Sequence, residues 1–204
     1  MVEGVTEAGF SRARLKAFSD GVIAVIITIM VLELKAPESP QVSELLKLAP
    51  SFAIYFVSFV FVAIYWINHH DLISQARRVS AAVIWANNAL LLCLSLIPFA
   101  TAYVAITHLA PFPTMVYGAL QFSCGSAFAL TFSTIARQRR DEPEFALAAQ
   151  ARQRKNWAGL AAYALAVVIA AYSPTSALLL FVAVAVAYVV PSLFADASPR
   201  GRRQ

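Results

Sequence analysis

The sequence predicts an all-α integral membrane protein in which six transmembrane helices form a single domain. Hydrophobic residues make up 60% of the chain and charged residues only 13%, whereas soluble domains average about 45–50% and about 25%. The apolar residues gather into stretches of about 20, the length that crosses a bilayer as a helix. Lys and Arg residues fall mainly in alternate connections between these stretches, as in multi-pass membrane proteins.

Six stretches qualify as spans, and together they use most of residues 1–204. The fifth has about 17 residues, the lower limit for a span, and Pro174 separates it from the sixth. Five or seven spans fit the charge distribution less well. The charged segment 137–156 is expected to be a solvated connector in preference to an interfacial helix. The predicted spans are 17–34, 50–68, 81–106, 114–135, 156–172 and 175–194.

The distribution of positive charge predicts the orientation of the chain. Only two of its 16 Lys and Arg residues, Lys35 and Lys47, fall on the side opposite the others. Because cytoplasmic connections carry the excess of Lys and Arg, we expect both termini in the cytoplasm. The same distribution explains the net charge of +5 without nucleic acid, whose binding would call for aromatic residues among the basic ones. We expect contact with membrane lipids and no nucleic-acid partner.

Motifs for enzymatic chemistry are missing from the sequence. It contains no glycine-rich phosphate loop, no Walker sequence and no nucleophile elbow. We therefore predict that the protein is not an enzyme, uses no cofactor and holds no structural metal.

Polar side chains interrupt the first three spans at a similar depth. Successive spans cross in opposite directions, so all of these residues belong to the cytoplasmic half of the membrane; Asp20, for example, lies roughly 9 Å past Arg14 at about 1.5 Å per residue. An unpaired carboxylate at this depth costs a few kcal/mol. We therefore expect a joined network in which imidazole or amide groups, or Arg14, pair with Asp20. The intramembrane group comprises Ser19, Asp20, Trp66, His69, His70, Asn87 and Asn88.

Two roles for this network stay open on the sequence alone. It could fasten the helices to one another through hydrogen bonds. It could also relay protons, because histidine titrates near neutral pH. In that case the chain would be a proton-coupled secondary transporter that uses Asp20, His69 and His70.

The first span also carries a mostly apolar stripe on another face. At about 100° per residue, Val25, Thr28, Ile29 and Leu32 cluster about 130° away from Asp20. Such a stripe is more often a packing seam than the wall of a pore. However, Thr28 is its only hydroxyl, and small hydroxyls also line conduction paths.

The segment RLKAFSDGVIAVIITIMVLEL, from Arg14 to Leu34, resembles the signature of the transmembrane protein 175 family, the endolysosomal potassium channel family. The shared pattern is an arginine, three residues, Phe-Ser-Asp and an apolar helix ending in Val-Leu-Glu. The segment YWINHHDL, from Tyr65 to Leu72, is also similar to the family. The resemblance is greatest to single-repeat bacterial members and extends to the six-span architecture.

The resemblance implies a potassium-permeable cation channel of the bacterial inner membrane, a homotetramer whose first helices line a central pore. It assigns the pore positions to Val25, Thr28, Ile29 and Leu32, and potassium or other monovalent cations would pass near Thr28. An apolar side-chain constriction would replace the carbonyl filter of ordinary potassium channels, whose TVGYG segment this chain lacks.

The resemblance assigns the polar residues, with Arg14 and Phe18, to bracing within and between subunits. Phe18 would be a packing wedge, and Ser19 would donate a hydrogen bond to a neighbouring helix. Val25 stands where relatives often have isoleucine, so we expect a wider inner ring.

Overall fold

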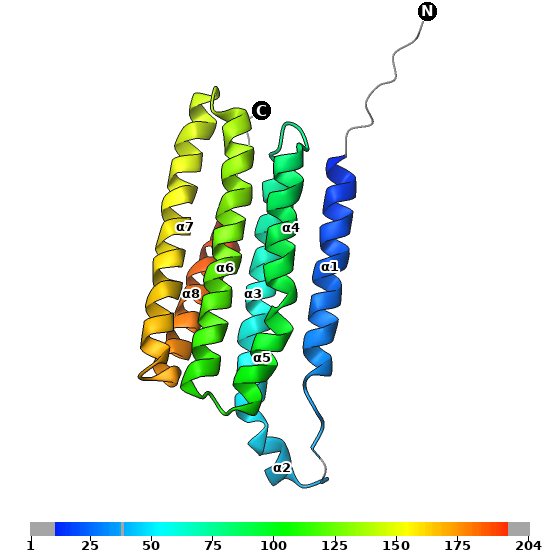
Figure 1. Cartoon of the computed structure of the whole chain (residues 1–204), viewed down its shortest axis with the longest axis vertical. Helices are drawn as coiled ribbons and strands as arrows, with labels where there is room; N and C mark the ends of the chain where they lie inside the picture. The colour runs from blue at the N-terminus through cyan, green and yellow to red at the C-terminus, as the bar shows by residue number, and fades with distance from the viewer. Residues whose placement is uncertain (1–10, 38, 196–204) are drawn as a thin grey trace, which may run out of the picture.

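The computed structural model describes residues 11–37 and 39–195, and every regular element in these ranges is helical (Figure 1). The predicted all-α class is therefore confirmed for this part of the chain. The elements are α1 (Arg12–Leu32), α2 (Val42–Lys47), α3 (Ala49–Ser74), α4 (Ala81–Ser95), α5 (Ile97–Ile106), α6 (Pro111–Ala136), the 3-10 turn η1 (Arg137–Arg139), α7 (Pro143–Ala170) and α8 (Pro174–Ala195).

Four helical segments of the described chain are long and apolar enough to cross a membrane. They are α1, α3, the α4–α5 pair taken as one rod, and α6 with η1. The predicted spans 156–172 and 175–194 fall on the second half of α7 and on α8. The number of six spans stays a prediction, because four segments of the described chain meet the criteria of length and composition. The cytoplasmic position of the chain ends also stays a prediction, and residues 1–10 and 196–204 lie outside the described ranges.

Two segments differ from the expectation. The predicted connector 137–156 is mostly helix, since α7 begins at Pro143 and continues without a break into the apolar half. Ala, Leu, Gln, Arg and Lys are good helix formers, and proline is tolerated in a first helical turn, where no N–H donor is needed. The predicted span 81–106 is two helices that meet at Leu96. Pro98 interrupts the rod because it has no N–H for the carbonyl of Leu94.

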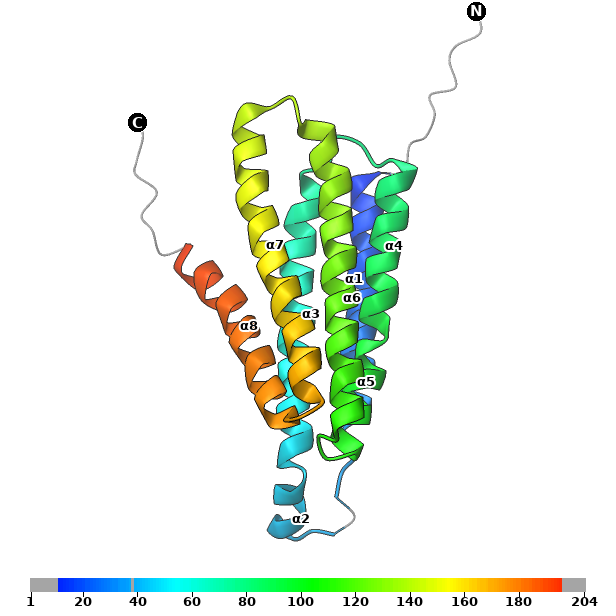
Figure 2. The same ribbon diagram turned by 60° about the vertical axis from the view of Figure 1, so that its left-hand side comes forward.

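The long helices pack side by side, with α1 at one edge of the bundle and α7 and α8 at the other (Figures 1 and 2). One core cluster joins α1 to α3, α4 and α6 through side chains such as Ile23, Val62 and Leu90. A second joins α3 and α6 to α5, α7 and α8, with Phe61 and Phe181 near its centre. Helices α3, α5 and α6 therefore contribute to both clusters, whereas the buried residues of α1 belong to the first alone.

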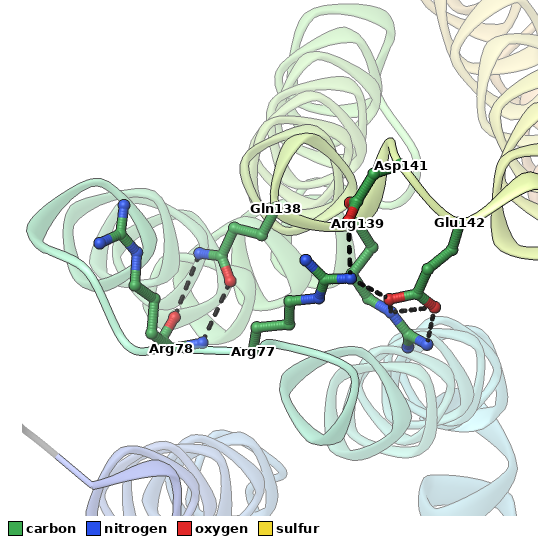
Figure 3. Close-up of polar contacts among 6 residues, drawn as sticks. All are labelled: Arg77, Arg78, Gln138, Arg139, Asp141 and Glu142. Carbon is green, nitrogen blue, oxygen red and sulfur yellow. Dashed lines mark hydrogen bonds and ion pairs between the residues drawn. The ribbon is translucent and has the colours of Figure 1, made fainter.

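A polar latch joins two connections at the end of the bundle where α1 begins (Figure 3). Arg77, between α3 and α4, donates to Asp141 at 3.1 Å and to Glu142 at 2.6 Å. Arg139 also donates to Glu142 through its Nε and Nη2. The side chain of Gln138 completes the latch: it accepts from the backbone N–H of Arg78 and donates to the carbonyl of the same residue.

The two guanidinium groups stabilise the charged form of Glu142. Hydrogen bonds from Arg139 and Arg77 lower the pKa of this carboxyl from 4.5 to about 2. A carboxyl whose pKa is depressed on folding contributes its full stabilisation above its ordinary pKa, and the contribution is lost as the pH falls through the folded value. The latch is therefore intact at neutral pH and weakens between about pH 4.5 and about pH 2.

We predict that Glu142→Gln lowers the melting temperature of the detergent-purified protein slightly at pH 7. The difference from wild type should shrink as the pH falls from 4.5 toward 2, because the wild-type carboxyl becomes protonated there. Thermal unfolding followed by tryptophan fluorescence measures this. Glu144→Gln is the control, since Glu144 makes no side-chain hydrogen bond or ion pair among the described residues. A pH-independent difference between wild type and Glu142→Gln would contradict the role of the latch.

Candidate functional site

Helix α1 has one buried face and one exposed face. Its buried residues recur at intervals of three or four, as expected for a helix that packs on one side. The buried face consists of Leu15, Ser19, Ile23, Ile26 and Met30.

The stripe identified in the sequence lies on the exposed face. Val25 is 55% exposed, Ile29 42% and Leu32 76%, and Thr28 is exposed between them. The Thr28 hydroxyl donates to the carbonyl of Val25 at 2.8 Å, so its proton is used within the helix and its oxygen is left to accept. The single chain thus presents an apolar face with one hydroxyl acceptor, and this face stays largely exposed.

Three buried polar side chains join α1, α3 and α4. The amide Nδ2 of Asn87 donates to Ser19 Oγ at 3.1 Å, and Asn87 Oδ1 lies 2.6 Å from Nε2 of His69. Ser19 Oγ in turn donates to the carbonyl of Leu15 at 2.9 Å. We call Ser19, His69 and Asn87 the triad.

The bonds of the triad fix the protons that it carries. Ser19 Oγ donates to the carbonyl of Leu15 at 2.9 Å and has a longer donor contact to Asn87 Oδ1 at 3.5 Å, while its oxygen accepts from Asn87 Nδ2. This orients the Asn87 oxygen toward His69, whose Nε2 must then be the donor. His69 Nδ1 is buried and has no partner among the described residues. Toward α4, Ser19 thus accepts from Asn87 at 3.1 Å and donates to it at 3.5 Å, so the donation that the resemblance implied is present as the longer of the two contacts.

Asp20 takes part in a separate contact. The indole Nε1 of Trp66 donates to Asp20 Oδ1 at 2.9 Å, and both side chains are only partly covered. Nearby, Lys16 Nζ lies 3.4 Å from His70 Nε2. The polar residues expected to form one network thus form three separate sets: the triad, the Asp20–Trp66 pair and the Lys16–His70 pair. Each set joins α1 to α3.

The remaining signature residues lie around these contacts. Phe18 is 55% exposed on the single chain, and Arg14 is exposed one turn before it. Asn88 is half-buried and makes no side-chain hydrogen bond in the described part of the chain. Of the two asparagines and two histidines, the structure thus brings Asn87 and His69 together in the buried triad.

Sequence reasoning missed a second buried polar cluster, between α3, α5 and α6. Thr101 Oγ1 donates to Ser58 Oγ at 2.8 Å, and Ser58 lies 3.0 Å from the Tyr117 hydroxyl. Gln121 Nε2 donates to Tyr117 at 3.3 Å. The available signal was the presence of Ser58 and Gln121 within apolar spans. The cluster satisfies its own hydroxyls, which favours a structural role.

Comparison with known proteins identifies relatives of the chain. The family model described as "Endosomal/lysosomal potassium channel TMEM175" matches residues 14–98. A potassium channel of Chryseobacterium sp. (strain P1-3) is 35% identical over 181 residues, which cover 89% of this chain and 94% of that protein. The human endosomal/lysosomal proton channel TMEM175 is 33% identical over 85 residues, 36% of this chain and 17% of that protein.

A solved structure also matches nearly the whole chain. It is the crystal structure of a lysosomal potassium-selective channel TMEM175 homologue from Chamaesiphon minutus. It covers 89% of this chain and 97% of its own, with a TM-score of 0.80 and 27% sequence identity.

We predict that Asn87→Ala destabilises the bundle, because it leaves Ser19 and His69 buried without their shared partner. The expected loss is about 1–3 kcal/mol of unfolding free energy, measured as a lower melting temperature in detergent. Asn88→Ala is the matched control: it makes the same truncation one residue further along α4 and breaks no hydrogen bond of the described chain. Equal effects of the two substitutions would remove the triad from any fastening role.

Proposed function

This chain belongs to the TMEM175 family, as the segments from Arg14 to Leu34 and from Tyr65 to Leu72 predicted, and from that premise we propose that it is the subunit of a potassium-permeable cation channel. In this proposal each chain is one domain of six spans with both ends in the cytoplasm. Four copies assemble in the bacterial inner membrane around a central pore lined by α1.

The observation that carries the proposal is the exposed stripe on α1. An exposed apolar face with a hydroxyl acceptor suits the wall of a lumen, and α1 stands at the edge of the chain, where symmetric copies can approach it (Figure 1). If four copies meet there, Val25, Thr28, Ile29 and Leu32 form successive rings around the axis.

These rings provide a physical mechanism for gating. Narrow apolar rings of Ile29 and Leu32 exclude water and thereby block ions, and a small widening or rotation of α1 restores conduction. Val25 forms a further, wider ring toward the cytoplasmic side. Because the Thr28 proton is held by the Val25 carbonyl, its oxygen offers a lone pair to a partly dehydrated potassium ion.

In the same proposal, the polar contacts hold α1 in position. The triad ties the buried face of α1 to α3 and α4, and the Trp66–Asp20 bond ties its flank to α3. Phe18 and Arg14, both exposed on the single chain, brace a neighbouring subunit. In this proposal the stripe lines the path of the ions, and the polar residues hold α1 against its neighbouring helices.

The alternative function, a proton-coupled secondary transporter, needs protons to pass among Asp20, His69 and His70. In the described chain, Asp20 is bonded to Trp66, His69 to Asn87 and His70 to Lys16, and no hydrogen bond links the three to one another. This arrangement favours the channel.

The purified chain in potassium-containing planar bilayers tests the proposed function. We expect unitary current steps that persist without a proton gradient, since a pore needs no coupling ion. Flux that requires a proton gradient and saturates at carrier rates would establish the transporter instead.

We predict that Leu32→Ala raises the unitary conductance or the closed-state leak several-fold. Four alanine side chains around the axis leave a wider opening than four leucine side chains, so water remains in the constriction. Val31→Ala is the control: Val31 is exposed on α1 but lies about 100° away from Leu32. Identical currents from wild type and Leu32→Ala, with normal expression, would exclude Leu32 from the constriction.

We predict that Thr28→Ala lowers the permeability ratio of potassium to sodium toward unity, whereas Thr28→Ser keeps it. The ring of hydroxyl acceptors is lost in the first variant and retained in the second. Reversal potentials in bi-ionic solutions measure the ratio. An unchanged ratio in Thr28→Ala would show that selectivity arises elsewhere.

A further inference from the structure

The bundle contains a cavity of about 420 Å³ among α3, α6, α7 and α8. None of its lining residues comes from α1. Figure 2 shows that α8, which contributes Tyr188 to the wall, diverges from α7 toward its C-terminal end. Ala151 and Lys155 in its wall are exposed, so the cavity reaches the surface of the bundle. Its position is remote from the stripe on α1.

One part of the cavity wall is positively charged. Arg152 is half-buried there: its guanidinium donates to Asn68 Oδ1 at 3.3 Å and lies 5.8 Å from the ring of Phe128. Lys155 Nζ lies 4.3 Å from the ring of Tyr188. Among the described residues, no carboxylate comes within ion-pair distance of either cation. The carboxylate of Asp71 acts on Arg152 electrostatically, from beyond ion-pair distance. The wall therefore holds two positive charges, and neither of them is engaged in an ion pair among the described residues.

The same part of the wall contains a hydrogen-bond donor without an acceptor. Asn156 Nδ2 is buried, and no described residue accepts from it. Buried donors without an acceptor are rare in folded proteins, so this amide is a candidate to bind a ligand. Two cations and a vacant amide donor on one helical segment together form a site for an oxyanion.

The rest of the wall is apolar and aromatic. Phe61, Ile64, Tyr65, Leu160 and Tyr163 contribute to it from α3 and α7. A free inorganic anion would gain nothing from this surface, whereas an amphiphile with an anionic head would use both parts. The cavity thus matches a molecule that is charged at one end and hydrocarbon at the other.

The position of the cavity along α7 agrees with a lipid. The first half of α7 is rich in charged residues up to Lys155, and the second half is apolar. Arg152 and Lys155 mark this boundary, which corresponds to the headgroup level of a bilayer. Basic pockets between membrane helices at that level bind anionic headgroups.

We propose that this cavity binds an anionic phospholipid of the surrounding leaflet. The phosphate accepts from Arg152, Lys155 and Asn156, and the upper part of an acyl chain packs on the aromatic wall. The remainder of the lipid extends into the bilayer. This site does not depend on which helix lines the pore, so it stands or falls separately from the proposed channel activity.

Native mass spectrometry and thermal unfolding of the detergent-purified full chain test the proposal. We expect phosphatidylglycerol to bind and to raise the melting temperature more than phosphatidylcholine. Arg152→Gln should weaken phosphatidylglycerol binding about tenfold, the value of a charge-assisted hydrogen bond. Arg154→Gln is the matched control: it removes the same charge from an exposed position of α7 outside the cavity. Equal loss in both variants would reduce the effect to general basic charge and overturn the proposal.

A second variant separates ligand binding from folding. Asn156→Asp keeps the size of the side chain but places a carboxylate beside the two cations, so it should leave the fold intact and abolish the preference for phosphatidylglycerol. A preference that survives in this variant would overturn the proposal. Inorganic phosphate at the same concentration should produce no shift. A shift equal to that of the lipid would assign the cavity to a free anion and also overturn it.

Discussion

The arrangement of α1 depends on the hydrogen bonds of the Asn87 amide, because this one side chain of α4 bonds a residue of α1 and a residue of α3. Its nitrogen donates to Ser19 and its oxygen accepts from His69, and all three side chains are buried. Inside an apolar bundle there is no water to replace a broken hydrogen bond. Helix α1 therefore has one rotation that satisfies the triad, and that rotation turns the stripe outward.

Because α1 packs against the bundle on one side alone, its rotation needs a polar constraint of this kind. The buried face of α1 is aliphatic except for Ser19, and aliphatic side chains pack acceptably in several rotations. Between lipid and a protein core, the hydrophobic effect distinguishes these rotations weakly. Polar contacts distinguish them strongly, since each requires a particular angle. The Trp66–Asp20 bond adds a second fixed point on the flank of the same helix.

Much of α1 could be predicted from the sequence because its information is local. The helical period alone separated the stripe of Val25 and Leu32 from Asp20, and the structure leaves that stripe exposed while Asp20 turns to Trp66. Choosing Trp66 over an imidazole as its partner could not be predicted, since the choice depends on how α1 and α3 rotate against each other. Matched depth predicted that the polar residues lie near one another, but not that they divide into three groups.

The errors in the remaining helices have a different origin. Charge in the segment 137–156 indicated a connector, yet charge and helix formation are independent: Arg, Lys and Gln are good helix formers wherever water or headgroups solvate their tips. The sequence therefore predicted where the apolar part of α7 begins, but not where the helix begins. The cavity was missed for the same reason, because Arg152 and Lys155 were assigned to a solvated connector, whereas they lie on a helix that packs on α6 and α8.

The two sides of the bundle meet at consecutive residues of α3. Asn68 accepts from Arg152 in the wall of the cavity, and the next residue, His69, bonds Asn87 in the triad. Neighbouring positions on a helix point about 100° apart, so one turn of α3 faces both α7 and α4. Strain at one of these contacts is transmitted to the other, because both residues lie on the same turn of one helix in a close-packed interior. Occupancy of the cavity would in this way bear on the rotation of α1 without touching it, through a single turn of α3.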